Sequence, residues 1–93
     1  MLVSTIRLEL RLAECHSLKD KRHVLRGMLE SIRRKFNVSI AEVAHHDAWQ
    51  TAVIGVAVVG SEHRFLEKVL TEVEQIITSQ PGVDIVGVEH ERW

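Results

Sequence analysis

Charged side chains gather at the start of a predicted helix, in the run Ser17-Leu18-Lys19-Asp20-Lys21-Arg22. Ser17 is a typical helix N-cap, and Asp20, three residues later, matches the spacing of a capping box. Lysine and arginine in the first turn are repelled by the partial positive charge of the helix N-terminus, which costs a little stability. Because backbone N–H groups at a helix start also attract anions, we expect these cations to serve a negatively charged partner.

More cations continue along the same predicted helix. At about 100° per residue, one flank carries a row of four cations within roughly 60° of one another. Such a row can follow the phosphates of a nucleic acid. The predicted anion- or RNA-binding residues are Ser17, Lys19, Lys21, Arg22, Arg26 and Arg33. The alternative is a solvated helix face whose long side-chain stems shield the edge of the core.

One thiol and one isolated carboxylate are further candidates for chemistry. Cys15 precedes the cation-rich helix start, an environment expected to lower its pKa. A nucleophile also needs an oriented base and an oxyanion site, and neither can be assembled here, so no enzyme activity is predicted. Glu42 lies in an otherwise apolar predicted strand. We expect Glu42 either to face outward or to pair with a cation, within one subunit or between two.

The run His45-His46-Asp47 contains metal-ligating residue types. Adjacent residues in a strand point to opposite faces, so two neighbouring histidines rarely share one ion. His16 or His90 would have to complete the site, and no known ligand spacing is present. We therefore predict a polar hairpin at this position, with no metal and no cofactor.

Length and composition predict one domain over residues 1–93, with 45% hydrophobic and 27% charged residues. No apolar run reaches bilayer-spanning length, no signal peptide is visible, and the single cysteine excludes an internal disulfide, so a cytoplasmic protein is expected. Residues 16–36 hold seven cations and two carboxylates, a net charge of +5, whereas residues 62–93 carry −4. The basic segment is suited to bind an anion, or to pair with the acidic segment in an oligomer.

Hydrophobic periodicity predicts six elements in the order β-α-β-β-α-β. The strands are predicted at Leu2–Leu12, Val38–Ala44, Gln50–Gly60 and Val83–Glu89, and the helices at Leu18–Phe36 and Glu62–Ser79. Asn37 is the predicted C-cap of the first helix and Ser61 the N-cap of the second. Right-handed crossovers then place both helices on one face of an antiparallel sheet with strand order 4-1-3-2, an α+β ferredoxin-like two-layer sandwich.

This fold leaves the other face of the sheet uncovered. The third strand is apolar on both sides, and either Val86 with Val88 or Val83 with Ile85 is expected to extend the exposed apolar area. Such patches mark interfaces, so we expect a homodimer or a larger oligomer through the open face or a strand edge. The alternative is a small patch broken up by charged residues of the first strand. These are Arg7, Glu9 and Arg11.

Four segments resemble the YlxP-like family, a bacterial domain of unknown function. They are Ser17–Arg22, Phe36–Val43, Trp49–Ala52 and Gly55–Ala57, and the resemblance covers nearly the whole chain. It implies a ferredoxin-like domain with no established enzyme activity and no catalytic residues to carry over. Genes of this family often lie beside those for translation initiation factor two and ribosome-binding factor A, which implies a role in ribosome maturation or translation.

We therefore expect a non-catalytic cytosolic accessory factor of ribosome maturation or translation. It would bind phosphates of ribosomal RNA, or of the small ribosomal subunit, through the basic helix. The central strands carry no aromatic residue, so the base-stacking sheet of the RNA-recognition module is not expected. The alternative function is a homo-oligomeric structural or regulatory protein that binds a protein or a small anionic ligand through its open sheet face.

Overall fold

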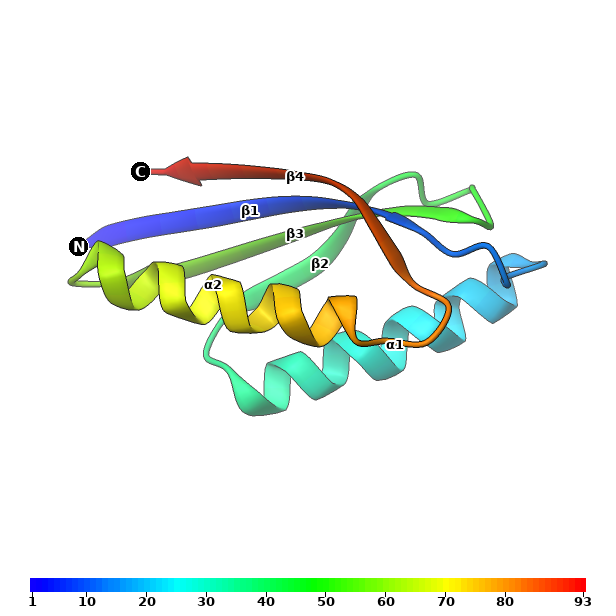
Figure 1. Cartoon of the computed structure of the whole chain (residues 1–93), viewed down its shortest axis with the longest axis horizontal. Helices are drawn as coiled ribbons and strands as arrows, with labels where there is room; N and C mark the ends of the chain where they lie inside the picture. The colour runs from blue at the N-terminus through cyan, green and yellow to red at the C-terminus, as the bar shows by residue number, and fades with distance from the viewer.

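The computed structural model describes all residues from Met1 to Trp93. The elements are β1 (Leu2–Arg11), α1 (Leu18–Lys35), β2 (Ser39–Ala44), β3 (Thr51–Gly60), α2 (His63–Thr78) and β4 (Asp84–Arg92). The four strands form one antiparallel sheet in the order β2-β3-β1-β4, and Figure 1 shows both helices on the same side of it. The predicted ferredoxin-like sandwich and its strand order are confirmed.

The core lies between the sheet and the two helices. Ile6, Leu8 and Leu10 of β1 are almost fully buried, and the even-numbered side chains of β3 join them from the neighbouring strand. These residues alternate with polar or smaller ones, because successive side chains in a strand point to opposite faces. The helices add apolar stripes at helical spacing, which close the core from the other layer. Neither helix combines the length and the apolar character that a membrane crossing requires.

The N-terminus of α1 is capped by side chains. The Ser17 hydroxyl accepts a hydrogen bond from the Asp20 backbone N–H at 3.0 Å, as the capping box predicts. The Asp20 carboxylate accepts a hydrogen bond from the His16 backbone N–H at 3.0 Å. In a capping box the expected donor is the backbone N–H of the N-cap itself, here Ser17, one residue later. These bonds satisfy backbone donors at the start of the helix, which otherwise lack intrahelical partners.

Most predicted element ends shift by one residue in the structure, and three differences concern a helix cap or the length of a strand. Glu62, and not Ser61, is the N-cap of α2, and its side chain makes no capping hydrogen bond. The C-cap of α1 is Phe36, one residue before Asn37. β4 continues to Arg92, three residues beyond its predicted end, because its last residues pair with β1 up to Ser4. That segment is polar, so periodicity alone does not indicate a strand there.

The open face of the sheet is less apolar than predicted. The expected extension by Val86 with Val88, or by Val83 with Ile85, is wrong. Val88 and Ile85 pair with core residues of β1 and therefore lie on the helix side, and a register shift leaves Val86 as an extra residue. On the open side, the Arg7 guanidinium lies 3.1 Å from a carboxylate oxygen of Glu9. The open face is thus interrupted by charge, as the alternative interpretation expected.

Candidate functional site

A groove of about 700 Å³ opens between the first turns of α1, the β1–α1 loop and the α2–β4 loop. Lys19, Arg22 and Arg26 lie along the α1 side of this groove, and their side chains are exposed. None of the three forms an ion pair in the structure. The structure therefore gathers half of the predicted anion-binding residues at one concave surface, with their positive charges free to meet an external anion.

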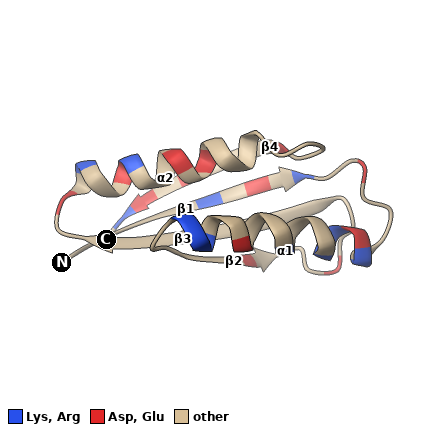
Figure 2. Cartoon of the chain, turned by 90° about the horizontal axis from the view of Figure 1, so that it is seen from below, with Lys and Arg blue, Asp and Glu red and all other residues tan.

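The groove also contains two carboxylates, from Glu14 and Asp20. Asp20 is engaged in capping α1. Glu14 packs against the opposite wall, where Gly82 adopts a positive φ of 75°. A β-carbon added to Gly82 would approach a Glu14 carboxylate oxygen to 2.9 Å, so glycine is required here both by the turn and by this close contact. Three cations against two carboxylates leave the groove net positive, and Figure 2 shows cations at the same end of α1.

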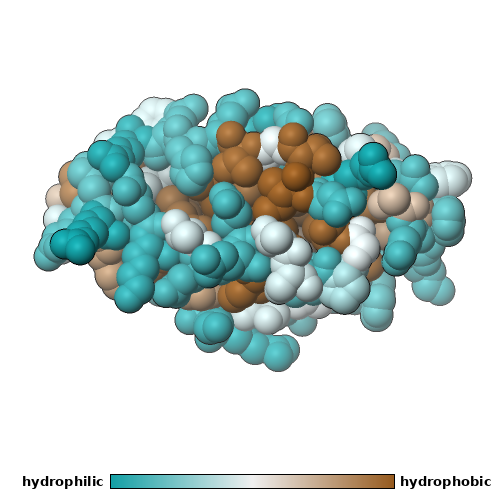
Figure 3. All heavy atoms as spheres, viewed as in Figure 1, coloured by the Kyte–Doolittle hydropathy of each residue, from teal (hydrophilic) through white to brown (hydrophobic).

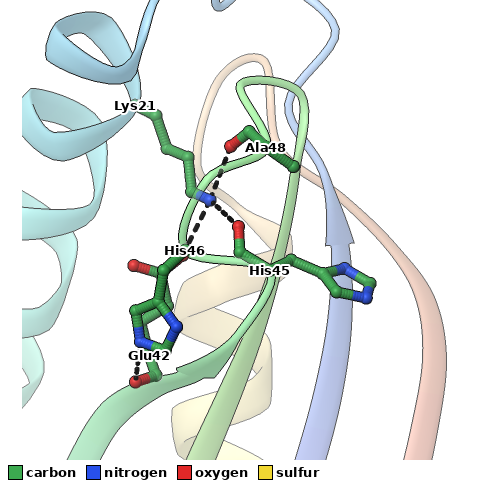
Figure 4. Close-up of polar contacts among 5 residues, drawn as sticks. All are labelled: Lys21, Glu42, His45, His46 and Ala48. Carbon is green, nitrogen blue, oxygen red and sulfur yellow. Dashed lines mark hydrogen bonds and ion pairs between the residues drawn. The ribbon is translucent and has the colours of Figure 1, made fainter.

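Lys21 lies outside the groove, and the prediction that it contacts an external phosphate is corrected. Its side chain is almost fully buried. The ammonium nitrogen donates to the backbone carbonyls of His45 and Ala48, both at 2.7 Å, and lies 2.7 Å from Glu42 Oε2 (Figure 4). Two of its N–H groups are satisfied by backbone carbonyls, and the Glu42 carboxylate supplies the counter-charge. Lys21 therefore ties the start of α1 to the connection between β2 and β3.

The same contact resolves the position of Glu42, whose predicted pairing with a cation is confirmed within a single chain. A signal for it exists in the sequence. Lys21 precedes Leu25 by four residues and Met28 by seven, so it continues the buried stripe of α1. A cation within an apolar stripe and an acid within an apolar strand are natural partners, because a buried charge needs a counter-charge.

The two remaining predicted anion-binding residues have structural contacts. Ser17 is half-buried and caps α1. Arg33 lies near the far end of α1, where a guanidinium N–H donates to the Ile40 backbone carbonyl at 2.7 Å. Neither residue lines the groove. The predicted row of cations is therefore divided, and only its first part faces a surface that can receive a ligand.

The structure reverses the expectation for Cys15. Burial raises the pKa of the Cys15 thiol, and the carboxylates of Asp20 and Glu14 raise it further, against the opposing influence of Lys21. The nearby cations were expected to lower it; Lys21 does so, but burial and the two carboxylates outweigh its influence. The thiol at this helix start is therefore less readily ionised than an ordinary cysteine.

The raised pKa of Cys15 predicts that its thiol reacts slowly with alkylating reagents. We expect iodoacetamide to alkylate Cys15 in the folded protein more slowly than in the urea-unfolded chain near pH 8, because the thiolate is the reactive form and burial raises the pKa of the thiol. With a raised pKa, the rate should climb only at a pH above the ordinary range for cysteine. Mass spectrometry of the alkylated fraction against time measures this. Equal rates in the folded and unfolded chain would contradict the expectation.

The His45-His46 connection forms a turn. The Ala48 N–H donates to the His45 carbonyl at 3.1 Å, and His45 adopts a positive φ of 62°. Figure 4 shows the two imidazole rings pointing away from each other. The His46 Nε2 atom lies 3.2 Å from the Glu42 carbonyl, to which it is placed to donate. No three side chains of His, Cys, Asp or Glu are arranged to hold a metal ion.

Comparisons with known proteins agree with this architecture. A de novo designed protein with ferredoxin fold superposes with a TM-score of 0.59 at 11% identity, over 100% of this chain and 84% of that one. The de novo designed protein Foldit4 gives a TM-score of 0.54 at 15% identity, over 99% of this chain and 94% of that one. At these identities the likeness shows the fold alone.

Sequence comparison identifies relatives. The "Uncharacterized protein YlxP" of Bacillus subtilis (strain 168) is 43% identical over 68 residues, which cover 73% of this chain and 74% of that protein. Residues 3–90 match the family described as "Protein of unknown function (DUF503)". The resemblance predicted from the four segments is thereby confirmed, and the chain belongs to the DUF503 family of YlxP-like proteins.

Proposed function

We propose that this protein is a non-catalytic, cytoplasmic accessory factor of ribosome maturation or translation, which binds RNA phosphates at the groove beside α1. The observation that carries the proposal is the set of three exposed cations without carboxylate partners, Lys19, Arg22 and Arg26. Unpaired cations on a rigid helix attract polyanions, because binding releases the counterions condensed on the nucleic acid.

The spacing of these cations supports a chain of phosphates as their partner. Residues 19, 22 and 26 share one helix flank, and a rise of 1.5 Å per residue spreads them over roughly 10 Å. That length is similar to three nucleotide rises of about 3.4 Å. Contacts to phosphates alone carry no sequence information, so weak sequence preference is expected. The ribosomal context is supported by the gene neighbourhood of the family.

Filter binding to ribosomal RNA over a salt series tests the proposal. Three phosphate contacts predict that the affinity falls about 20- to 40-fold between roughly 50 and 200 mM salt. A tagged copy recovered from cells at low salt should bring small ribosomal subunits or their precursors with it. Binding that is insensitive to salt, or recovery without any ribosomal RNA, would contradict the proposal.

A further inference from the structure

The groove beside α1 has an apolar interior as well as a cationic side. Leu12 and Cys15 line it although they are only 1% and 5% exposed, so they lie at its bottom. Val24 and Pro81 add further apolar atoms to the lining. The outer surface is polar, because Figure 3 shows mainly hydrophilic atoms at the end of the molecule where α1 begins. The groove therefore offers a surface for a flat, uncharged group in addition to its positive charges.

The loops that form the groove are held in place by hydrogen bonds. The Gln50 side-chain amide donates to the backbone carbonyls of Ala13 and Cys15 at 3.2 and 3.1 Å. In the α2–β4 loop, the Val83 N–H donates to the Gln80 carbonyl at 3.3 Å. The volume of about 700 Å³ lies within the range of pockets that hold small organic ligands. A preformed groove of this size can receive a nucleotide without the cost of ordering its walls.

One carboxylate of the groove has no partner. Asp20 is engaged in capping, but Glu14 forms no side-chain hydrogen bond and no ion pair. It lies against Gly82 of the α2–β4 loop. A carboxylate repels phosphate, so its position here is unfavourable for a ligand made of phosphates alone. Because an ionised carboxylate only accepts hydrogen bonds, Glu14 suits a ligand that carries N–H donors together with negative charge.

Among the RNA bases, guanine matches this carboxylate. Proteins recognise unpaired bases by hydrogen bonds to the Watson–Crick edge and by stacking on rings such as histidine, and His23 also lines the groove. The edge of guanine presents two adjacent donors, N1–H and the N2 amine, to which the two oxygens of one carboxylate can bind. Adenine and cytosine present one donor beside an acceptor, and uracil presents one donor between two acceptors. A carboxylate is repelled by these acceptors.

We propose, on the basis of the RNA binding proposed above for the same groove, that it holds one unpaired guanine nucleotide. The base lies on the apolar floor, with its Watson–Crick edge on Glu14. The neighbouring phosphates lie on Lys19, Arg22 and Arg26. Phosphate contacts position the strand, whereas the contact to the base edge carries sequence information. The preference is therefore limited to one nucleotide, and it requires that this guanine is not base-paired.

Fluorescence anisotropy with short oligouridines that contain one central guanine or inosine tests this preference. Inosine lacks only the N2 amine, so both strands carry the same charge. Near 0.1 M salt the guanine strand should bind about tenfold more tightly, because inosine loses a hydrogen bond to a charged group. Annealing a complementary strand should remove the difference. Equal affinities of the single strands would overturn the guanine site and leave phosphate binding intact, whereas failure to bind either strand would overturn both proposals.

Glu14→Gln assigns the preference to this carboxylate. The change replaces one acceptor oxygen with an NH₂ donor, so the affinity ratio of guanine to inosine strands should fall to about one. The inosine strand should bind no more weakly, since a negative charge is removed. Glu30→Gln is the matched control, because Glu30 is exposed on α1 outside the groove. Circular dichroism confirms that both variants fold. A ratio that Glu14→Gln leaves unchanged, or that both variants lower equally, would overturn the assignment.

Competition distinguishes RNA from a free nucleotide as the source of the guanine. Guanosine monophosphate brings the same base with a single phosphate, so it lacks the contacts that neighbouring phosphates make. It should displace the guanine strand only at a concentration about tenfold or more above that of the unlabelled strand. Equal competition by both would overturn RNA as the ligand of this site.

Discussion

Replacing Lys21 with methionine is expected to lower the free energy of unfolding by about 3 kcal/mol. Removing one partner of a buried ion pair costs about 3–5 kcal/mol, because the other charge remains without compensation. The lower end applies because the Glu42 side chain is still 19% exposed. The carbonyls of His45 and Ala48 also lose the donor that they hold at 2.7 Å. For a domain of this size such a loss is a large part of the total stability.

Urea unfolding followed by circular dichroism measures this loss. Lys19→Met is the matched control, because Lys19 is exposed on the same helical turn and should change stability by no more than about 0.5 kcal/mol. The double variant Lys21→Met/Glu42→Gln should recover part of the stability, since no uncompensated charge remains. If Lys21→Met unfolds at the same urea concentration as wild type, the tie between α1 and the β2–β3 connection is not stabilising.

Replacing Lys19, Arg22 and Arg26 together with alanine is expected to weaken RNA binding about 100-fold near 0.1 M salt. Each lost phosphate contact removes about one unit from the slope of log affinity against log salt, so the triple variant should lose a slope of about 2 to 3. The three side chains are exposed and unpaired, so their removal should leave the fold intact.

The double variant Arg64→Ala/Lys68→Ala is the control for charge itself. Both residues are exposed on α2, outside the groove, and neither is ion-paired. Its affinity and salt slope should fall much less than those of the triple variant. If the control and the triple variant weaken binding in proportion to the charge removed, the attraction is general and the groove is not the RNA-binding surface.

Local patterns in the chain were enough to predict the architecture. Alternation in β1 and helical spacing in α1 reflect which side chains are buried, and right-handed crossovers leave one strand order. The cap at Ser17 and the cationic flank of α1 are also local, because they depend on residues within two helical turns. These features therefore follow from residue spacing alone.

Contacts between distant segments decided the rest. The spacing of Lys21 places it on the buried stripe of α1, but the carbonyls that accept its hydrogen bonds, those of His45 and Ala48, come from the return of the chain 24 and 27 residues later. The pKa of Cys15 depends on how the loops around it exclude water, which outweighs the nearby cations. A register shift in β4 determines which face its valines occupy. Burial and register are properties of packing, which a linear spacing of residue types does not contain.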